Sequence, residues 1–160
     1  MQGTPASSTQ KTFQFGDTPA LADRLAALVV AGVKTGTCSA AVHGPDAEVG
    51  DRQVCLSGAG QPVCEIETLS LQTLRFDEVP AELSVLEGEG DLSHRYWREA
   101  HEAYFAREGT WTPEMEVIFE VFRVTKIFDE DFAAGAIDVV ARERAEAIAN
   151  GYTALGGDDG

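Results

Sequence analysis

The chain has 160 residues, 44% hydrophobic and 24% charged, which is enough for one domain with its own core. Its formal net charge is −15, with 12 Lys and Arg against 27 Asp and Glu. This balance argues against a broad basic surface for binding long nucleic acids through their phosphates, whereas a nucleoside-sized substrate meets no such objection. No apolar run is long enough to span a bilayer and residues 1–12 lack a signal-peptide core, so we expect a cytoplasmic protein with no membrane partner.

Three cysteines, Cys38, Cys55 and Cys64, occur in apolar, strand-like surroundings without a CxxC pair or a His at ligand spacing. We therefore expect reduced, buried thiols and no structural zinc, and the sequence predicts no metal ligands.

Residues 1–12 are rich in Ser, Thr, Gln, Gly and Pro and are predicted to be disordered. Asp17 or Thr18 can cap a helix that begins near Pro19, carries Leu and Val at helical spacing and ends at Gly32. Gly32 is expected in a left-handed conformation. A strand is predicted over 37–42.

The middle of the chain predicts a β-hairpin, with strands over 52–56 and 62–76 joined at Gly58-Ala59-Gly60. A short helical segment follows from Asp77, and then an acidic loop, Glu87-Gly88-Glu89-Gly90-Asp91. Ser93 can cap a helix over 94–108 that Gly109 ends. The run 116–128 is the clearest strand, and 130–150 reads as a helix before a flexible tail.

Short strands in local or hairpin connections and two long helices indicate an α+β domain around a curved or barrel-like sheet. The predicted organisation is a disordered segment at 1–12, the domain at 13–128, and an added C-terminal helix with a flexible tail at 129–160. No βαβ rhythm, phosphate loop or dinucleotide fingerprint is present.

Lys34, Thr35 and Thr37 lie where the first helix gives way to a strand. Lys34 could simply offset the carbonyl end of the helix dipole. Alternatively it points into a cleft, where a buried amine acts as a base or a fixed cation holds an anion. Thr37 would then be its hydrogen-bonding partner or an activated nucleophile, and Thr35 would contact the substrate.

The acidic loop could place a carboxylate opposite Lys34, or it could be an exposed acidic turn. The helix after it carries aromatic, basic and imidazole groups within two turns: Tyr96, Trp97, Arg98 and His101. Such groups can grip a nucleobase, but large aromatic side chains in this pattern more often belong to the core.

Five segments follow one another in a recognisable order: Gly32 to Thr37, Gly50-Asp51, Phe76 to Val79, Glu87 to Asp91 and Tyr96 to His101. In this order, the motifs resemble the bacterial ASCH-domain proteins, whose fold is similar to the PUA domain of RNA-modifying enzymes. The resemblance implies a small β-barrel flanked by helices, with a cleft for RNA or a nucleobase. It also implies RNA binding, ribonuclease activity or hydrolysis of acetylated cytidine.

In the amidohydrolase branch of that family, a Lys, a Thr three residues later and a more distant Glu form the catalytic set. Lys34 and Thr37 match the first two, and Glu87 is the candidate for the third, with Glu65 as the alternative.

The leading hypothesis is thus a hydrolase acting on RNA or a modified nucleoside. Only the ribonuclease version would use a divalent metal ion, at the acidic loop; no other cofactor is expected. The alternatives are a non-catalytic RNA- or nucleotide-binding module and an acidic protein-interaction domain. The oligomeric state is open, and a homodimer is one option.

Overall fold

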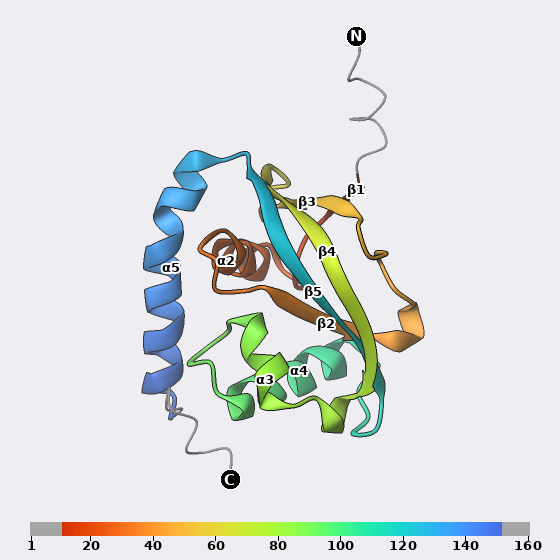
Figure 1. Cartoon of the computed structure of the whole chain (residues 1–160). Coiled ribbons are helices and arrows are strands. Elements are labelled where there is room, and N and C mark those ends of the chain that lie inside the picture. The colour runs from red at the N-terminus through yellow and green to blue at the C-terminus, as the bar shows by residue number, and fades with distance from the viewer. Residues whose placement is uncertain (1–10, 152–160) are drawn as a thin grey trace.

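A computed structural model describes residues 11–151 of the chain (Figure 1). The disorder predicted for residues 1–10 and the tail predicted at 152–160 lie outside the described residues. Lys11 and Thr12, which the composition assigned to the disordered segment, form a short strand with Phe13.

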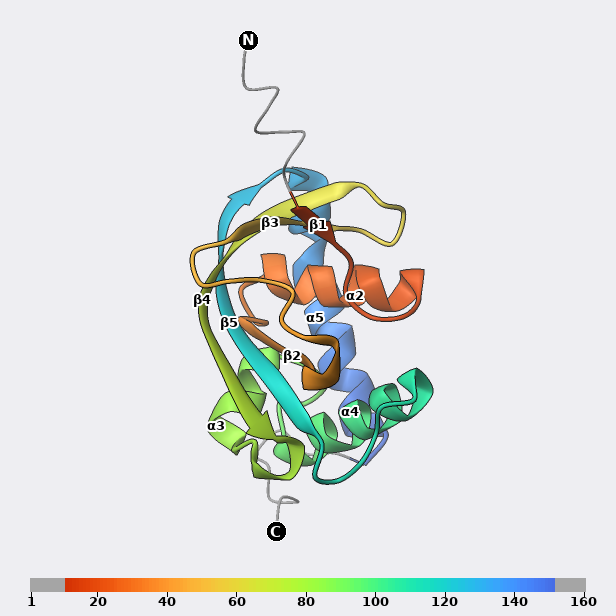
Figure 2. The same ribbon diagram turned by 90° about the vertical axis from the view of Figure 1, so that its right-hand side faces the viewer.

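Five strands form one mixed sheet: β1 Lys11–Phe13, β2 Gly36–Ala40, β3 Arg52–Leu56, β4 Pro62–Arg75 and β5 Glu116–Ile127. Their order is β1-β3-β4-β5-β2, with β1 parallel to β3 and the other three pairs antiparallel. Register shifts at Glu65/Ile66 and Thr68/Ser70 interrupt the long β4–β5 ladder, as bulges that bend a sheet do. The sheet curves around the helices but does not close, so the expected barrel is an open, curved sheet (Figure 2).

Four α-helices and three 3₁₀ turns complete the described chain. The helices are α2 Pro19–Val30, α3 Ala81–Ser84, α4 His94–Glu108 and α5 Glu130–Ala149. The 3₁₀ turns are η1 Ala41–His43, η2 Phe76–Glu78 and η3 Val85–Glu87. The hydroxyl oxygen of Thr18 accepts a hydrogen bond from the Leu21 N–H at 3.1 Å, and that of Ser93 accepts one from the Tyr96 N–H at 3.0 Å. The polar residues predicted as caps therefore start both long central helices.

Two predictions about the strands need correction. The strand expected over 37–42 ends at Ala40, because residues 41–43 turn into η1. The local or hairpin connections expected for the strands do not hold throughout. β1 pairs with β3, and β2 pairs with β5, although long stretches of chain separate the paired strands. The β3–β4 hairpin forms as predicted.

The core has two hydrophobic clusters on the inner side of the curved sheet. One joins α2 to the sheet through buried side chains such as Leu28, Val63 and Phe122. The other joins α4 to the N-terminal part of β5 through Trp97, Phe105 and Phe119. Helix α5 packs against α2 and crosses it steeply, as Figures 1 and 2 show together. No helix of the described chain combines the length and the apolar character needed to cross a membrane.

Candidate functional site

The segment carrying Lys34 is fixed between the end of α2 and the acidic loop. Gly32 has the left-handed conformation predicted for it, with φ of 81°. The chain then turns back, so that the Lys34 N–H donates to the Leu28 carbonyl at 3.0 Å. The Thr35 N–H donates to the Leu86 carbonyl at 2.7 Å, which joins this segment to η3. These backbone bonds set where the Lys34 side chain enters the protein.

The two glycines of the acidic loop allow it to pack tightly against its neighbours. Gly88 and Gly90 have φ of 69° and 62°. A Cβ at Gly88 would collide with the carbonyl of Val33, and one at Gly90 with the ring of Tyr96. Only glycine meets both requirements at these positions, which explains why glycine alternates with acidic residues here.

Lys34 is one of the most buried residues of the described chain, with 1% of its surface exposed. Its Nζ lies 2.9 Å from Glu87 Oε1 and 3.0 Å from Glu89 Oε2. Burial by itself would lower the pKa of Lys34, but the charges of the two carboxylates outweigh it and hold the pKa above its ordinary value. Lys34 is therefore a fixed cation rather than an exposed helix-capping residue.

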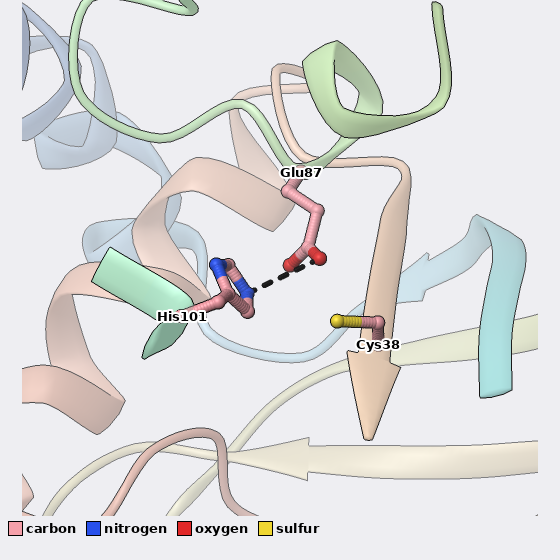
Figure 3. Close-up of side chains that lie close together, drawn as sticks. All are labelled: Cys38, Glu87 and His101. Atoms are coloured by element: carbon pink, nitrogen blue, oxygen red, sulfur yellow. Dashed lines mark ion pairs between the residues drawn. The ribbon is translucent and has the colours of Figure 1, made fainter. Parts of the chain in front are cut away.

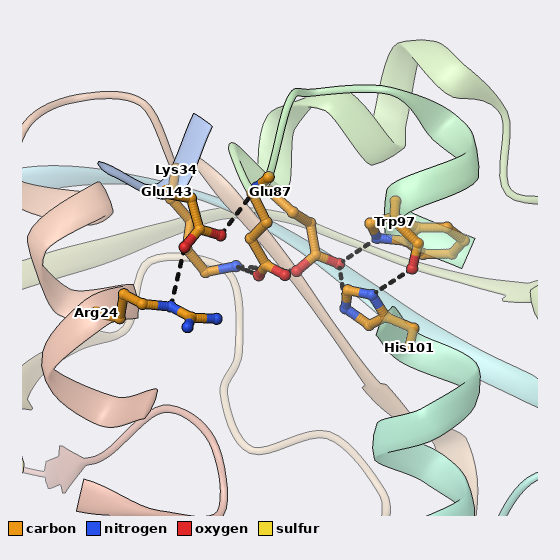
Figure 4. Close-up of polar contacts among 8 residues, drawn as sticks. Arg24, Lys34, Glu87, Trp97, His101 and Glu143 are labelled. Atoms are coloured by element: carbon orange, nitrogen blue, oxygen red, sulfur yellow. Dashed lines mark hydrogen bonds and ion pairs between the residues drawn. The ribbon is translucent and has the colours of Figure 1, made fainter. Parts of the chain in front are cut away.

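Glu87 connects Lys34 to the aromatic helix α4 (Figure 4). Its Oε2 accepts a hydrogen bond from Trp97 Nε1 at 2.9 Å and lies 3.2 Å from His101 Nε2. Burial would raise the pKa of Glu87, yet the neighbouring charges of His101 and Lys34 bring it well below the usual range. The carboxylate is thus ionised although only 1% of the residue is exposed.

His101 is held in one orientation by its other ring nitrogen. Nδ1 lies 2.8 Å from the Trp97 carbonyl oxygen, which can only accept, so Nδ1 carries a proton. The ring also stacks on the Trp97 indole, with centroids 4.7 Å apart. Burial opposes its charge, but Glu87 prevails and raises the pKa of His101 well above its ordinary value. His101 therefore faces Glu87 as an imidazolium.

Cys38 lies close to the same two groups. Burial, with the nearby charge of Glu87, raises the pKa of its thiol to about 12. The thiol is consequently protonated at neutral pH and is not an activated nucleophile.

A cavity of about 640 Å³ opens between α2, α4 and the sheet. Five of the residues proposed from the sequence line it: Lys34, Thr37, Glu87, Tyr96 and His101. Thr35, Trp97 and Arg98 are not among the lining residues. Trp97 is instead a core residue stacked on Phe76 at 5.0 Å, in line with the structural alternative weighed for it. Of the two candidate acids, Glu87 reaches Lys34, while Glu65 accepts from the Thr125 hydroxyl on the sheet.

Three further residues contribute to the site. Glu89, from the acidic loop, shares the Lys34 ammonium and lines the cavity. Cys38, expected only as a small buried hydrophobe, lies beside Glu87 and His101. Glu143, on α5, accepts from the Gly90 N–H at 2.9 Å and pairs with Arg24 at 2.9 Å, which braces the acidic loop from outside (Figure 4). In the sequence, the alternation of Glu and Gly was the only signal for Glu89. Nothing in the sequence of α5 pointed to Glu143.

Comparison with known proteins places this arrangement in context. Residues 11–126 match the family model described as the ASCH domain. An ASCH domain from Lactobacillus crispatus JV V101 is 29% identical, with a TM-score of 0.68, over 77% of this chain and 86% of that one. Protein EF3133 from Enterococcus faecalis V583 is 26% identical, with a TM-score of 0.65, over 74% of this chain and 82% of that one. No curated protein matches the chain.

Proposed function

Since the chain belongs to the ASCH domain family and has a PUA-like fold, we propose that its cavity is the active site of a hydrolase that removes an acyl group from a modified nucleoside such as acetylcytidine. The observation that carries this proposal is the convergence of Lys34, Thr37 and two carboxylates on one cavity. A fixed cation beside carboxylates can stabilise the oxyanion of acyl transfer while a carboxylate handles the proton.

The roles follow from charge and exposure. Because Lys34 stays protonated, it serves as the anion holder rather than the base, two roles that the sequence left open. Glu87 has its pKa lowered and is a weak base. The Glu89 side chain is the more exposed of the two carboxylates, 12% against 1%, so we assign proton transfer to it.

With the Thr37 hydroxyl, these groups supply one complete route for the hydrolysis. A water oxygen attacks the acetyl carbonyl carbon, and Glu89 takes the proton of that water. The oxyanion forms beside Lys34, with the Thr37 hydroxyl as a second donor. The carbon–nitrogen bond then breaks, and the amino group of the nucleoside leaves with the proton that Glu89 received.

Size, lining and charge support a nucleoside rather than long RNA as substrate. The cavity volume of about 640 Å³ falls within the range of small-molecule sites. Tyr96 and Tyr104 line it and offer ring faces against which a base can stack. With a net charge of −15, the chain as a whole repels a polyphosphate.

Thr37→Val tests the proposal, because valine keeps the shape of threonine and removes the hydroxyl. Incubation with acetylcytidine, followed by chromatography of the products, should show a rate lower by about 100-fold or more for this variant. Thr35→Val is the matched control, since Thr35 does not line the cavity, and it should retain the wild-type rate.

Three outcomes would overturn the proposal. Equal rates for the Thr37 and Thr35 variants would remove Thr37 from the chemistry. Cleavage of a labelled single-stranded RNA, with acetylcytidine left intact, would identify a ribonuclease instead. Saturable binding of either compound without product would indicate a binding module.

A further inference from the structure

Three potential metal ligands from distant parts of the chain meet at one wall of the cavity (Figure 3). Cys38 comes from β2, Glu87 from the end of η3 and His101 from α4. One ligand atom from each lies within 4.8 Å of the other two. All three residues also line the cavity, so the cluster has access to whatever enters it.

The orientation of His101 is the one that metal-binding histidines adopt. Its Nδ1–H donates to the Trp97 carbonyl, which leaves Nε2 directed at Glu87 Oε2 at 3.2 Å. A ligating imidazole usually donates its other N–H to a carbonyl or carboxylate in this way, which fixes the ring before the ion arrives. Glu87 is fixed likewise, because Trp97 Nε1 donates to its Oε2.

We propose that Cys38, Glu87 and His101 bind a zinc ion, with the fourth coordination position directed into the cavity. A thiolate, an imidazole and a carboxylate together suit Zn²⁺ better than Mg²⁺ or Ca²⁺, which prefer oxygen ligands. Three protein ligands and one open position are the arrangement of zinc sites that accept a water or a substrate.

The separations need only a small adjustment. With normal zinc bond lengths, the ligand atoms of a tetrahedral site lie about 3.3 to 3.7 Å apart. The Glu87–His101 distance of 3.2 Å already fits. The separations that involve the Cys38 sulfur are at most 4.8 Å, so a side-chain rotation that moves this sulfur by about 1 Å would close the set.

The charges around the cluster accommodate the ion. The positive charge of Lys34 would repel a bound cation, but Lys34 contacts Oε1 of Glu87. The ion would use Oε2, which lies on the side of His101. Binding displaces one proton from the Cys38 thiol and one from His101 Nε2. The zinc ion brings two positive charges and the two displaced protons carry two away, so the buried cluster keeps its net charge.

This inference goes beyond the proposed hydrolysis, because zinc binding is measured without turnover. Isothermal titration with ZnCl₂ should show one tight site per chain. Replacement by Co²⁺ should add the near-ultraviolet charge-transfer absorption that reports a thiolate–cobalt bond. Cys38→Ser should abolish that absorption, and both Cys38→Ser and His101→Gln should weaken zinc binding by more than about tenfold.

Matched controls lie outside the cluster. Cys64→Ala removes a thiol buried elsewhere in the core, and His43→Gln removes an exposed imidazole; both should bind zinc as the wild type does. Should the cluster variants fail to fold, zinc should still protect Cys38 of the wild-type chain from alkylation, as mapped by mass spectrometry. Absence of the charge-transfer absorption from the wild type, or equal zinc affinity in Cys38→Ser, would overturn the site.

Discussion

Two carboxylates line the same cavity in opposite electrostatic situations. Glu87 is almost fully buried, yet its pKa is lowered, because the charges of His101 and Lys34 outweigh the cost of burial. Glu120, on β5, is only partly buried, yet its pKa is raised. Burial raises the pKa of Glu120, and the negative charges of nearby Asp46 and Asp51 raise it further. The hydrogen bond that Glu120 accepts from the Thr68 hydroxyl at 2.7 Å lowers this pKa, but only in part.

The difference shows that partners, rather than depth, decide which carboxylate stays charged. Around Glu87 the cavity lining is a compensated cluster of opposite charges, whereas the charged neighbours of Glu120 are the carboxylates of Asp46 and Asp51. The lining therefore combines a fixed ammonium at Lys34 with hydrogen-bond acceptors at Glu120. A neutral nucleoside with amino groups suits that polarity better than a phosphate chain does.

The largest expected effect comes from breaking the compensated cluster around Lys34. Lys34→Met leaves Glu87 and Glu89 facing each other without their shared cation, in a site from which water is largely excluded. We expect the free energy of unfolding to fall by about 3 to 5 kcal/mol, measured by urea denaturation at pH 7.

Lys11→Met is the control for this prediction. Lys11 pairs with Asp51 at 3.1 Å, but 57% of its side chain is exposed, so its loss should cost less than about 1 kcal/mol. Adding Glu89→Gln to Lys34→Met should recover part of the loss, because it removes the charge that faces Glu87 once the lysine is gone, while Glu87 keeps its pairing with His101. A drop below about 1 kcal/mol for Lys34→Met would mean that water screens the cluster after all.

A smaller effect is expected from loosening the loop that carries the two carboxylates. Glu143→Gln keeps the size of the side chain but weakens its hydrogen bond from the Gly90 N–H and its ion pair with Arg24. We expect a loss of about 1 to 3 kcal/mol, with faster hydrogen exchange at the Gly90 amide.

Glu146→Gln is the matched control on the same helix, because Glu146 is exposed, and it should change stability by less than about 0.5 kcal/mol. Unchanged exchange at Gly90 in the Glu143 variant would show that the loop holds its shape without α5. The family model ends at residue 126, so this brace lies beyond the matched region.

Local signals explain what could be predicted from the sequence. Thr18, Ser93 and Gly109 mark helix ends through bonds within a few residues, and the glycines at 58–60 mark a hairpin for the same reason. A carboxylate of the acidic loop opposite Lys34 was one of two open options, and Glu87 could be singled out only through the family resemblance, because 53 residues separate it from Lys34.

Contacts without a local signal were missed. The parallel pairing of β1 with β3 depends on how the whole sheet assembles, and nothing in three residues of sequence specifies it. Likewise, Cys38 looks like an ordinary strand residue until α4 brings His101 beside it. Glu143 belongs to a helix whose sequence shows only a run of Ala, Glu and Arg, so its reach to Gly90 appears only in the folded chain.

The smallest effect should come from Glu120, and it should have the opposite sign. Because the pKa of Glu120 is higher in the folded chain than in the unfolded one, the folded state binds its proton more tightly. Below the unfolded pKa the carboxyl is neutral in both states and costs nothing. As pH rises through the folded pKa, ionisation progressively destabilises the wild type.

Glu120→Gln removes that ionisation while its amide oxygen can still accept from Thr68. The variant should therefore match the wild type near pH 4 and exceed it at pH 7 by less than about 1 kcal/mol, as measured by urea denaturation at both values. Glu87→Gln should behave in reverse and lose most at pH 7, because its lowered pKa makes the charged form the stabilising one. If both variants shifted stability in the same direction at pH 7, the two carboxylates would not differ as their partners imply, and burial alone would govern both.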